Sequence, residues 1–382
     1  MLFANWIRSL KVGRLIAATS LALGAGIIAT SSQAAEPVGA VYLLSNELSG
    51  NAILVYARAT DGSLTYSASY PTGGTGAIIA GNPPPDPLAS QGSLTLGSGM
   101  LFAVNAGSNE ISMFRAHGTT LALLDRQPSG GVHPVSIAVH GSYAYVLNAG
   151  ATPNISGFFI DAAAGRLKPL PGSQRSLAGG TASAAAQVSF NGDGNILLVS
   201  EKGTNLIDLY RVDHRGYASD SKPFKSNGAV PFGFDITNRG YAIFSEAGPN
   251  AASSYEIDDD GSLSLISGSV PLTGQVATCW LITTHDGRYA FTANAGTGTI
   301  SSLKVAPDGK LTLVNATASA NLLAKPVLDM AITGNSKFLY IRDDGNNTVT
   351  GFRIGPDGSL TTVGSATFPA SVLATVQGIA AR

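Results

Sequence analysis

The sequence predicts an all-β fold, a seven-bladed β-propeller with four antiparallel strands in each blade. Three observations carry this prediction. One phrase recurs seven times along the chain, Asp-Gly turns separate alternating strands, and charged residues make up only 12% of the chain. Repeats of about 40 to 50 residues with several short strands are typical of propeller blades. A low charge content suits short strands joined by turns rich in Gly, Ser, Thr and Asn.

The recurring phrase consists of an apolar strand, a short polar loop and a second alternating strand. Residues 102–109 and 244–250 are two clear copies. Aligning one residue of each copy gives spacings of 59, 43, 52, 45, 49 and 48 residues. The aligned residues are Asn46, Asn105, Asn148, Ser200, Ser245, Asn294 and Arg342. Seven copies at this period predict seven blades.

A second repeated feature marks the outer hairpins. Asp followed by Gly occurs at a constant offset after a strand in four copies. Gly accepts the positive φ that a tight hairpin turn requires. These turns begin at Asp61, Asp260, Asp308 and Asp357. We interpret the acidic run 258–260 as part of such a turn rather than as a calcium loop, because the spaced ligands of a calcium loop are missing.

The C-terminal segment is expected to close the ring. No inner strand precedes Val41, and residues 376–380 are similar to inner strands such as 135–139. They would complete blade one and leave no exposed sheet edge. No linker or change in composition divides residues 35–382, so these residues are predicted to form one domain.

Residues 1–34 have the pattern of a secretory signal peptide. Arg8, Lys11 and Arg14 precede an apolar stretch, and small residues allow a cut after Ala34. A transmembrane anchor is the alternative, but the apolar stretch is shorter than the roughly 20 residues of a spanning helix. We therefore expect an exported protein, periplasmic or secreted, with no membrane span after cleavage.

Charge and cysteine content exclude several kinds of site. Without the leader, 20 Lys and Arg stand against 24 Asp and Glu, a net charge of −4. Nucleic acid is therefore not an expected partner, because its binding requires a basic surface. The single cysteine, Cys279, rules out an internal disulfide, and its apolar neighbours indicate a buried side chain rather than a nucleophile. No histidine pair has zinc-site spacing, so neither a metal nor a cofactor is expected.

A small-molecule ligand is expected at one end of the central channel. With strands A to D counted outward from the axis, the B–C loops and the D-to-A connections share one end of the ring. The residues that begin the inner strands would surround the channel mouth there. They are Gln91, His133, Gln187, Phe232, Cys279 or Trp280, Asp329 and Gln377. Their amide groups suit a neutral or sugar-like ligand, and the absence of Arg and Lys among them disfavours a phosphate.

The longest connection lies at the same end. Residues 73–90 join blade one to blade two and include the proline-rich run 83–87. A stiff loop over the mouth would line or cover the ligand site. A surface loop without a role is the alternative interpretation.

Three side chains are candidate catalytic groups. His133 begins an inner strand, where its imidazole could act as a general base, with a packed structural histidine as the alternative. Glu201 and Glu246 lie in B–C loops, in aligned positions where other copies carry Ala, as at Ala106. A solvated surface acid is the alternative for each. Asp329 would be partly buried, so it needs a hydrogen-bond donor or a raised pKa.

The motifs at 105–112 and 130–136, with the Asp-Gly-Ser-Leu turns, resemble the bacterial lactonase-family propellers. This family includes the 6-phosphogluconolactonase type and the fungal carboxymuconate cyclase type. The resemblance covers essentially the whole chain after the leader and implies a seven-bladed fold. Because one fold hosts many reactions, the resemblance reports architecture better than activity.

The resemblance also implies lactone chemistry on the channel face. In the cyclase type a histidine, a glutamate and arginines act there. The nearest matches in this chain are His133, Glu47, Glu201 and Glu246. The arginines have no clear counterpart, although Lys202 and Arg342 lie in B–C loops, and this departure disfavours anionic substrates.

Two functional hypotheses remain. In the first, an exported lactonase-like enzyme hydrolyses or isomerises a small cyclic ester. His133 or a carboxylate activates water, and amide groups with Lys202 stabilise the oxyanion. In the second, the chain is a non-enzymatic propeller that binds a ligand or a protein at the B–C end. The chain is expected to be a monomer. The predicted ligand-binding residues are Gln91, Gln187, Lys202, Asp329, Gln377 and Glu47.

Overall fold

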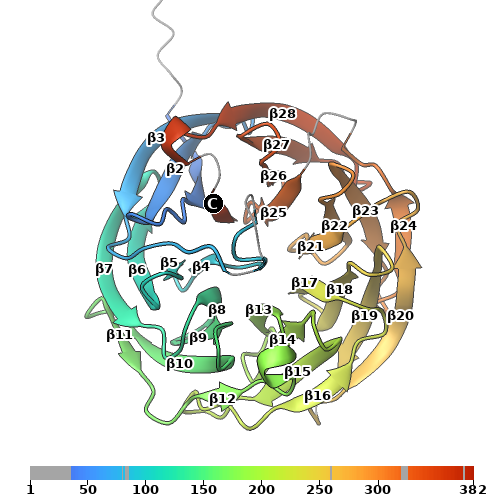
Figure 1. Cartoon of the computed structure of the whole chain (residues 1–382). Helices are drawn as coiled ribbons and strands as arrows, with labels where there is room; N and C mark the ends of the chain where they lie inside the picture. The colour runs from blue at the N-terminus through green and yellow to red at the C-terminus, as the bar shows by residue number, and fades with distance from the viewer. Residues whose placement is uncertain (1–35, 80, 82–85, 259, 320–325, 373–374) are drawn as a thin grey trace, which may run out of the picture. The chain divides into compact units, whose positions relative to one another are not determined.

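The computed structural model confirms the predicted seven-bladed propeller. Seven antiparallel sheets form a ring within the unit Glu36–Arg382, and each sheet runs from an inner strand near the axis to an outer strand at the rim (Figure 1). The predicted leader lies outside the described residues. The structure describes residues 36–79, 81, 86–258, 260–319, 326–372 and 375–382.

The first four blades each run from an inner strand to an outer strand in the following order. Blade one consists of β29 (Gln377–Ala381), β1 (Gly39–Leu44), β2 (Ala52–Arg58) and β3 (Leu64–Pro71). Blade two consists of β4 (Leu94–Gly97), β5 (Met100–Asn105), β6 (Glu110–His117) and β7 (Thr120–Pro128). Blade three consists of β8 (Pro134–His140), β9 (Tyr143–Asn148), β10 (Asn154–Asp161) and β11 (Arg166–Pro169), and β12 (Arg175–Ser176) also pairs with β10. Blade four consists of β13 (Ala185–Phe190), β14 (Ile196–Glu201), β15 (Leu206–Arg211) and β16 (Lys222–Lys225).

The other three blades have the same arrangement. Blade five consists of β17 (Pro231–Ile236), β18 (Tyr241–Glu246), β19 (Ala251–Ile257) and β20 (Leu263–Pro271). Blade six consists of β21 (Thr278–Thr283), β22 (Tyr289–Asn294), β23 (Thr299–Val305) and β24 (Leu311–Asn315). Blade seven consists of β25 (Val327–Ile332), β26 (Phe338–Asp343), β27 (Thr348–Ile354) and β28 (Leu360–Thr367). Two short 3-10 helices, η1 (Gly180–Ala182) and η2 (Ala370–Val372), precede blade four and β29.

The C-terminal strand closes the ring as predicted. β29 pairs antiparallel with β1, with Leu43 opposite Ile379 and Val41 opposite Ala381. Blade one therefore takes its inner strand from the end of the chain and its other three strands from the beginning. This pairing satisfies the backbone groups of β1, which would otherwise form a sheet edge.

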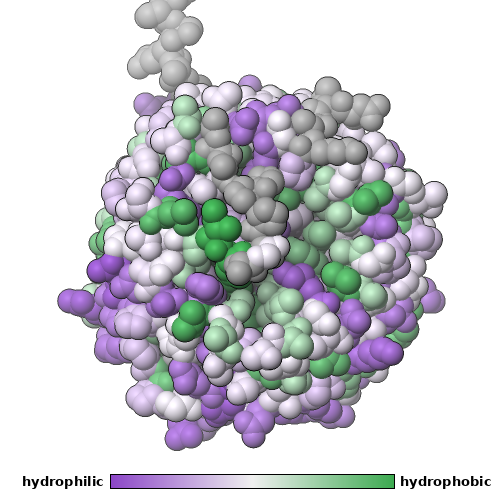
Figure 2. Space-filling model, in the orientation of Figure 1, coloured by the Kyte–Doolittle hydropathy of each residue, from purple (hydrophilic) through white to green (hydrophobic). Residues whose placement is uncertain are grey.

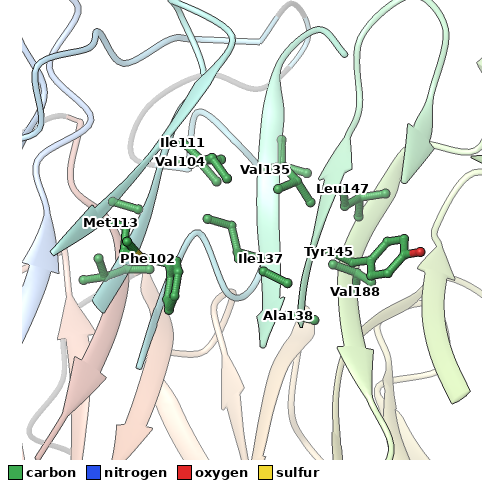
Figure 3. Packing of buried hydrophobic residues seen from close by; sticks show 14 of the residues in the cluster. Phe102, Val104, Ile111, Met113, Val135, Ile137, Ala138, Tyr145, Leu147 and Val188 are labelled. Atoms are coloured by element: carbon green, nitrogen blue, oxygen red, sulfur yellow. The ribbon is translucent and has the colours of Figure 1, made fainter. Parts of the chain in front are cut away.

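Apolar side chains fill the space between neighbouring blades. Val104 of β5, Ile111 of β6 and Ile137 of β8 are among the buried residues that pack between blades two and three (Figure 3). Tyr145 of β9 belongs to the same cluster, and its hydroxyl donates to the carbonyl oxygen of Gly216 in blade four at 2.8 Å. The blades are thus held by continuous apolar packing with a few directed polar contacts.

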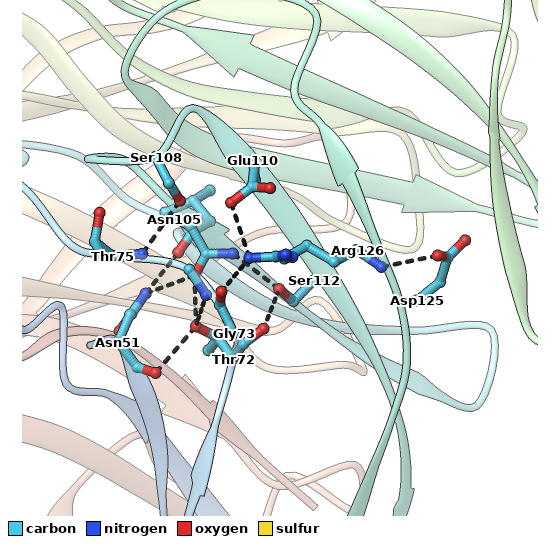
Figure 4. Close-up of polar contacts among 12 residues, drawn as sticks. Asn51, Thr72, Gly73, Thr75, Asn105, Ser108, Glu110, Ser112, Asp125 and Arg126 are labelled. Carbon is cyan, nitrogen blue, oxygen red and sulfur yellow. Dashed lines mark hydrogen bonds and ion pairs between the residues drawn. The ribbon is translucent and has the colours of Figure 1, made fainter.

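Strand B ends at a buried polar residue whose side chain forms hydrogen bonds with neighbouring strands and connections. In blade two, Asn105 accepts hydrogen bonds from Asn51 at 3.0 Å and Thr72 at 2.6 Å, and donates to Ser112 at 2.8 Å (Figure 4). The strand pairings place the equivalent residue at the end of strand B in six blades. These residues are Asn105, Asn148, Glu201, Glu246, Asn294 and Asp343.

The sequence alignment of this position is wrong by one residue in three blades. It matched Ser200, Ser245 and Arg342 with Asn105, whereas the pairings match Glu201, Glu246 and Asp343. A shift of one residue moves a strand side chain to the opposite face of the sheet. Glu201, Glu246 and Asp343 therefore occupy the position of Asn105. The two glutamates do not occupy the position of Ala106, as the sequence alignment had placed them.

Candidate functional site at the channel mouth

The connection from β3 to β4 reaches the centre of the ring (Figure 1). The N–H of Gln91 donates to the carbonyl oxygen of Ala186 in blade four at 3.1 Å. The carbonyl oxygen of Gly92 accepts from the N–H of Ile137 in blade three at 2.9 Å. We call the described end of this connection, residues 86–92, the plug. Residues 83–85 of the predicted proline-rich run lie outside the described residues, so a role of this run at a ligand site stays a prediction.

The side chain of Gln91 extends the plug to the opposite side of the channel. Its Nε2 donates to the carbonyl oxygen of Leu281 in blade six at 2.7 Å, and the N–H of Leu281 donates back to Oε1 at 3.0 Å. A Cβ atom on Gly233 would collide with Gln91 Oε1 and lie 2.9 Å from the carbonyl oxygen of Cys279, so glycine leaves room for this close approach. The plug therefore contacts inner strands on several sides of the axis.

Two side chains of the surrounding blades also hold the plug. Trp280 Nε1 donates to the carbonyl oxygen of Ser90 at 3.0 Å. The ammonium group of Lys202 donates to the carbonyl oxygen of Ala89 and lies 4.6 Å from the ring centroid of Phe232. An ammonium group has three donors, so the contact with Ala89 leaves two for another acceptor.

Charged side chains from blades one, four and seven gather around Asp86 of the plug. Gln377 Nε2 donates to Asp86 Oδ1 at 3.4 Å, and the positive charges of Arg342 and Lys202 act on the same carboxylate. Arg342 is fully buried and its Nη2 lies 2.6 Å from Asp344 Oδ2. We call this group the mouth cluster. Its members are Asp86, Lys202, Asp329, Arg342, Asp344 and Gln377.

Burial moves the pKa values of this cluster toward neutrality. Burial raises the pKa of Asp329 to about 7 and that of Asp344 to about 6, although Arg342 acts to lower both. Burial also raises the pKa of Asp86. It lowers the pKa of Lys202 to about 8, against the opposing effect of Asp86. Groups with such pKa values can exchange protons near neutral pH, which is a property of acid–base sites.

Cys279 lies beside the mouth cluster but does not suit nucleophilic chemistry. Burial, followed by the negative charge of Asp86, raises the pKa of its thiol to about 12. The thiolate is the nucleophilic form of cysteine, and a thiol with this pKa stays protonated at neutral pH. Cys279 is only half-buried, whereas the sequence predicted a buried side chain, and the raised pKa disfavours a role as a nucleophile.

The predicted glutamines are engaged by neighbouring backbone groups. Gln187 accepts from the N–H of Phe234 at 2.8 Å and donates to the carbonyl oxygen of Phe234 at 2.9 Å. Gln91 likewise donates to the carbonyl oxygen of Leu281 and accepts from its N–H. Gln187 satisfies the inner edge of the neighbouring blade five, and Gln91 satisfies that of blade six across the channel, so these amide groups already have partners within the protein.

The carboxylates of Glu201 and Glu246 are fully buried within their own regions of the ring. Glu201 accepts from the N–H of Gly179 at 3.0 Å and from the hydroxyl of Thr204. Burial, with a smaller effect of Asp208, raises the pKa of Glu201 to about 7.

Glu246 is tied to the outer part of blade five. It accepts from the N–H of Gly228 at 2.7 Å and from the hydroxyls of Ser253 at 2.5 Å and Ser269 at 2.6 Å. Ser269 belongs to the outermost strand, so the carboxylate is directed toward the rim of the blade. The described contacts do not bring Glu246 and Glu201 together.

His133 and Glu47 also lie at the B–C end. His133 has a left-handed backbone (φ 53°), is half-buried, and its N–H donates to Asn109 Oδ1 at 2.8 Å. Glu47 accepts from the hydroxyl of Thr375 at 2.6 Å. Among the hydrogen bonds of the described residues, none links His133 with Glu201 or Glu246. The catalytic roles of these three residues stay predictions.

The sequence contained a signal for part of the mouth cluster. The residue after the end of strand B is alanine in four blades, but Lys202 and Asp344 occupy this position in blades four and seven. With the correct register, these two departures from the repeat indicate the mouth. Sequence reasoning selected Lys202, Asp329 and Gln377 but missed Asp86 and Asp344. It placed Arg342 in a B–C loop, whereas Arg342 lies on strand β26.

In the part of the chain that is described, no three or more His, Cys, Asp or Glu side chains are grouped so that they could hold a metal ion. Among the same residues, no helix is long and apolar enough to cross a membrane. The space-filling view shows hydrophobic and hydrophilic surface side by side around the centre of the ring (Figure 2).

Comparisons with known proteins agree with this architecture. Residues 238–371 match the family model described as Lactonase, 7-bladed beta-propeller. The predicted resemblance to the lactonase-type propellers is therefore confirmed. A comparison with curated protein sequences finds no match.

Three solved structures illustrate the likeness. A candidate 6-phosphogluconolactonase of Bacteroides fragilis is 20% identical, with a TM-score of 0.64, over 88% of this chain and 97% of that chain. The periplasmic gluconolactonase of Pseudomonas aeruginosa is 16% identical, with a TM-score of 0.64, over 88% and 98%. A functionally unknown protein of Desulfotomaculum acetoxidans is 15% identical, with a TM-score of 0.63, over 90% and 98%. At these identities the likeness shows the fold alone.

Proposed function

We propose that this chain is an exported, lactonase-like enzyme that hydrolyses a small cyclic ester at the mouth cluster. One observation carries the proposal: Asp86 and Lys202 act on each other in a site where burial raises one pKa and lowers the other to about 8. Ester hydrolysis needs a base for the attacking water and an acid for the leaving oxygen. A carboxyl group and a lysine tuned in this way can supply both.

The proposed reaction begins with water between Asp86 and the lactone. The water oxygen bonds to the carbonyl carbon while Asp86 takes one of its protons. The ammonium group of Lys202 stabilises the oxyanion with the two donors that Ala89 does not use. As the ring C–O bond breaks, Lys202 gives a proton to the leaving oxygen and regains one from Asp86. The product is a hydroxy acid, and no other reactant is consumed.

The charges of the mouth cluster favour a neutral substrate. Lys202 and Arg342 are opposed by three acids, and Arg342 is already bound to Asp344. A phosphate requires an excess of positive donors, which this cluster lacks. The gluconolactonase of the same fold supports a sugar lactone as the first substrate to test.

The test is hydrolysis of a lactone panel by the protein purified after expression of the full chain. The panel contains glucono-1,5-lactone, an aromatic lactone and a phosphorylated sugar lactone. We expect turnover of a neutral lactone, with kcat/KM lowered about 100-fold or more in Asp86→Asn, since general-base catalysis contributes about that factor. In Lys202→Met we expect a loss of about 10-fold or more, because an oxyanion stabiliser is removed.

Two further variants make this test specific. Lys304→Met removes an exposed lysine on β23 and should leave kcat/KM unchanged. His133→Ala examines the base predicted from the sequence. Full activity in Asp86→Asn would refute the mouth-cluster mechanism, and a collapse in His133→Ala alone would transfer the role of base to the imidazole.

A non-enzymatic binding propeller is the second candidate function. One observation favours it: the plug occupies the centre of the ring and uses donors of Lys202, Trp280 and Gln91. Folded protein that turns over no lactone would support this candidate. Ligand-induced changes in thermal stability would then be the measurement to pursue.

Export completes the proposal. The pattern of residues 1–34 and the periplasmic location named for one protein of the same fold support it. The mass of the protein recovered from its producing cells tests export, because cleavage after Ala34 gives a chain that begins at Ala35. An uncleaved chain in the cytoplasm would contradict this part of the proposal.

A further inference from the structure

A cavity lies at the other end of the ring, where blades seven, one and two meet. Its volume is about 420 Å³, and it is bordered by the A–B turns of blades two and seven and by the end of β29. The mouth cluster is at the B–C end, so the two sites are separated by the length of the inner strands. The residues that line this cavity include Arg58, Leu96, Met100, Gly334, Asn335 and Arg382.

Arg58 is the chemically informative residue of this cavity. It is only 6% exposed, although an isolated guanidinium group is costly to bury. Its Nε donates to the carbonyl oxygen of Arg382 at 3.1 Å, and its guanidinium carbon lies 5.8 Å from the ring centroid of Phe338. Among the described residues, no Asp or Glu side chain lies within ion-pair distance of Arg58.

The rest of the wall combines apolar residues with two uncharged polar side chains, Thr333 and Asn335, and a second guanidinium group. Leu96 and Met100 border the space, and no lining residue carries a carboxylate side chain. Arg382 donates through Nη1 to the carbonyl oxygen of Ala116 at 2.8 Å. The cavity thus combines one buried guanidinium group, that of Arg58, with a partly apolar wall.

We propose that this cavity binds a small organic carboxylate with an apolar body. The carboxylate would lie against the guanidinium group of Arg58, which has donors besides Nε for planar two-point contact. The apolar body would pack on Leu96 and Met100. This site is independent of the proposed lactone hydrolysis, because no residue of the mouth cluster lines it.

The test is isothermal titration of the protein, purified after expression of the full chain, with hexanoate at low salt. Hexan-1-ol serves as the neutral probe of the same length, and inorganic phosphate as the anion without an apolar body. We expect one hexanoate per chain, with at least tenfold weaker binding of the alcohol and of phosphate, because both charge and apolar contact contribute. Equal affinity for hexanoate and hexan-1-ol, or tighter binding of phosphate, would overturn the proposal.

Two variants locate the bound hexanoate. Arg58→Gln should weaken binding at least tenfold, and Arg58→Lys should restore part of the loss because it keeps the charge. Gly334→Leu adds a side chain to the lining of the cavity, at a position where a Cβ atom meets no heavy atom within 4 Å. This variant should abolish binding while the circular dichroism spectrum stays that of the unmodified protein. Unchanged hexanoate affinity in folded Gly334→Leu would show that the ligand binds elsewhere and would refute the proposal.

Discussion

Blade four has acidic residues both at the end of strand B and at the contacting position of strand C. Glu201 ends strand B, and Asp208 stands seven residues later on strand C. In blades two, five, six and seven the second position is occupied by a serine or a threonine, for example Ser112, which bonds to Asn105. Both carboxyl groups are fully buried, and Asp208 Oδ1 has no donor among the described residues. Burial and the adjacent Asp208 carboxyl group both disfavour the ionised form of Glu201.

This pair makes stability fall as the pH rises. The pKa of Glu201 is raised from 4.5 to about 7, so the folded protein holds a proton that the unfolded chain releases. The free energy of unfolding contributed by this group therefore decreases between pH 4.5 and 7 and is lost above pH 7. Glu201→Gln keeps an oxygen that can accept from Gly179. We expect the free energy of unfolding of this variant, relative to the unmodified protein, to be higher at pH 8 than at pH 5 by about 1 kcal/mol or more.

Urea unfolding at the two pH values measures this effect. Glu256→Gln, on an exposed position of β19, provides the matched control and should follow the unmodified protein. Parallel pH dependence of Glu201→Gln and the unmodified protein would mean that Glu201 is ionised throughout, and the interpretation would fail.

The mouth cluster shows which residues can be predicted locally and which cannot. Lys202 and Asp329 were predictable because a repeat assigns each loop and inner strand to a known end of the ring. Asp86 was not, because its position depends on the path of a long connection that crosses the axis. That path is set by contacts such as Gln91 with Leu281, which are 190 residues apart in sequence. No local pattern of residues encodes such a contact.

At the level of the elements, the inner strands need partners on the side that faces the axis. Glutamine side chains provide them in place of a further strand: Gln187 bonds Phe234 of β17, and Gln91 bonds Leu281 of β21. Asp235 plays the same role for the N–H of Thr283 at 2.8 Å. The polar ring that the sequence suggested as a ligand surface is therefore partly a means of satisfying strand edges.

This role gives a prediction for Gln91→Ala. The variant leaves both the N–H and the carbonyl oxygen of Leu281 without their side-chain partner in a buried region. Each unsatisfied buried polar group costs about 1 to 3 kcal/mol, so we expect a loss of about 2 kcal/mol or more in the free energy of unfolding. Urea titration measures the loss. Gln127→Ala, half-buried on β7, should change stability by less than about 1 kcal/mol, because only weak contacts with Asp125 are lost. Equal effects of the two substitutions would contradict the edge role of Gln91.

At the scale of the whole molecule, the plug divides the ring into two separate ends. The B–C end has the mouth cluster, with mixed charge and pKa values near neutrality. The opposite end has the cavity around Arg58, with positive charge and a partly apolar wall. Because the plug contacts inner strands across the axis, a ligand cannot pass through the described channel from one end to the other without displacing it. The two proposed sites can therefore be occupied independently, and variants at one should not alter binding at the other.

The integrity of the ring depends on a single strand, β29. Removal of residues 376–382 would expose the edge of β1 and the side chains that β29 covers. It also removes Val376, Ile379 and Ala380, which are almost fully buried. Burying one large aliphatic side chain contributes about 1.5 to 3 kcal/mol, so we expect a loss on the order of 5 kcal/mol. The exposed edge should also promote self-association, visible in size-exclusion chromatography.

A rearranged chain distinguishes loss of the strand from loss of a chain terminus. Arg382 pairs through its N–H with the carbonyl oxygen of Ala40, so the end of β29 lies beside the beginning of β1. Residues 375–382 can therefore be placed ahead of residue 36, joined by a short Gly-Ser turn, so that β29 and β1 form a hairpin. We expect this chain to recover most of the thermal stability and remain monomeric, because closure requires the strand and not its place in the sequence. If the rearranged chain were as unstable as the truncated one, ring closure by β29 would not account for the stability of the propeller.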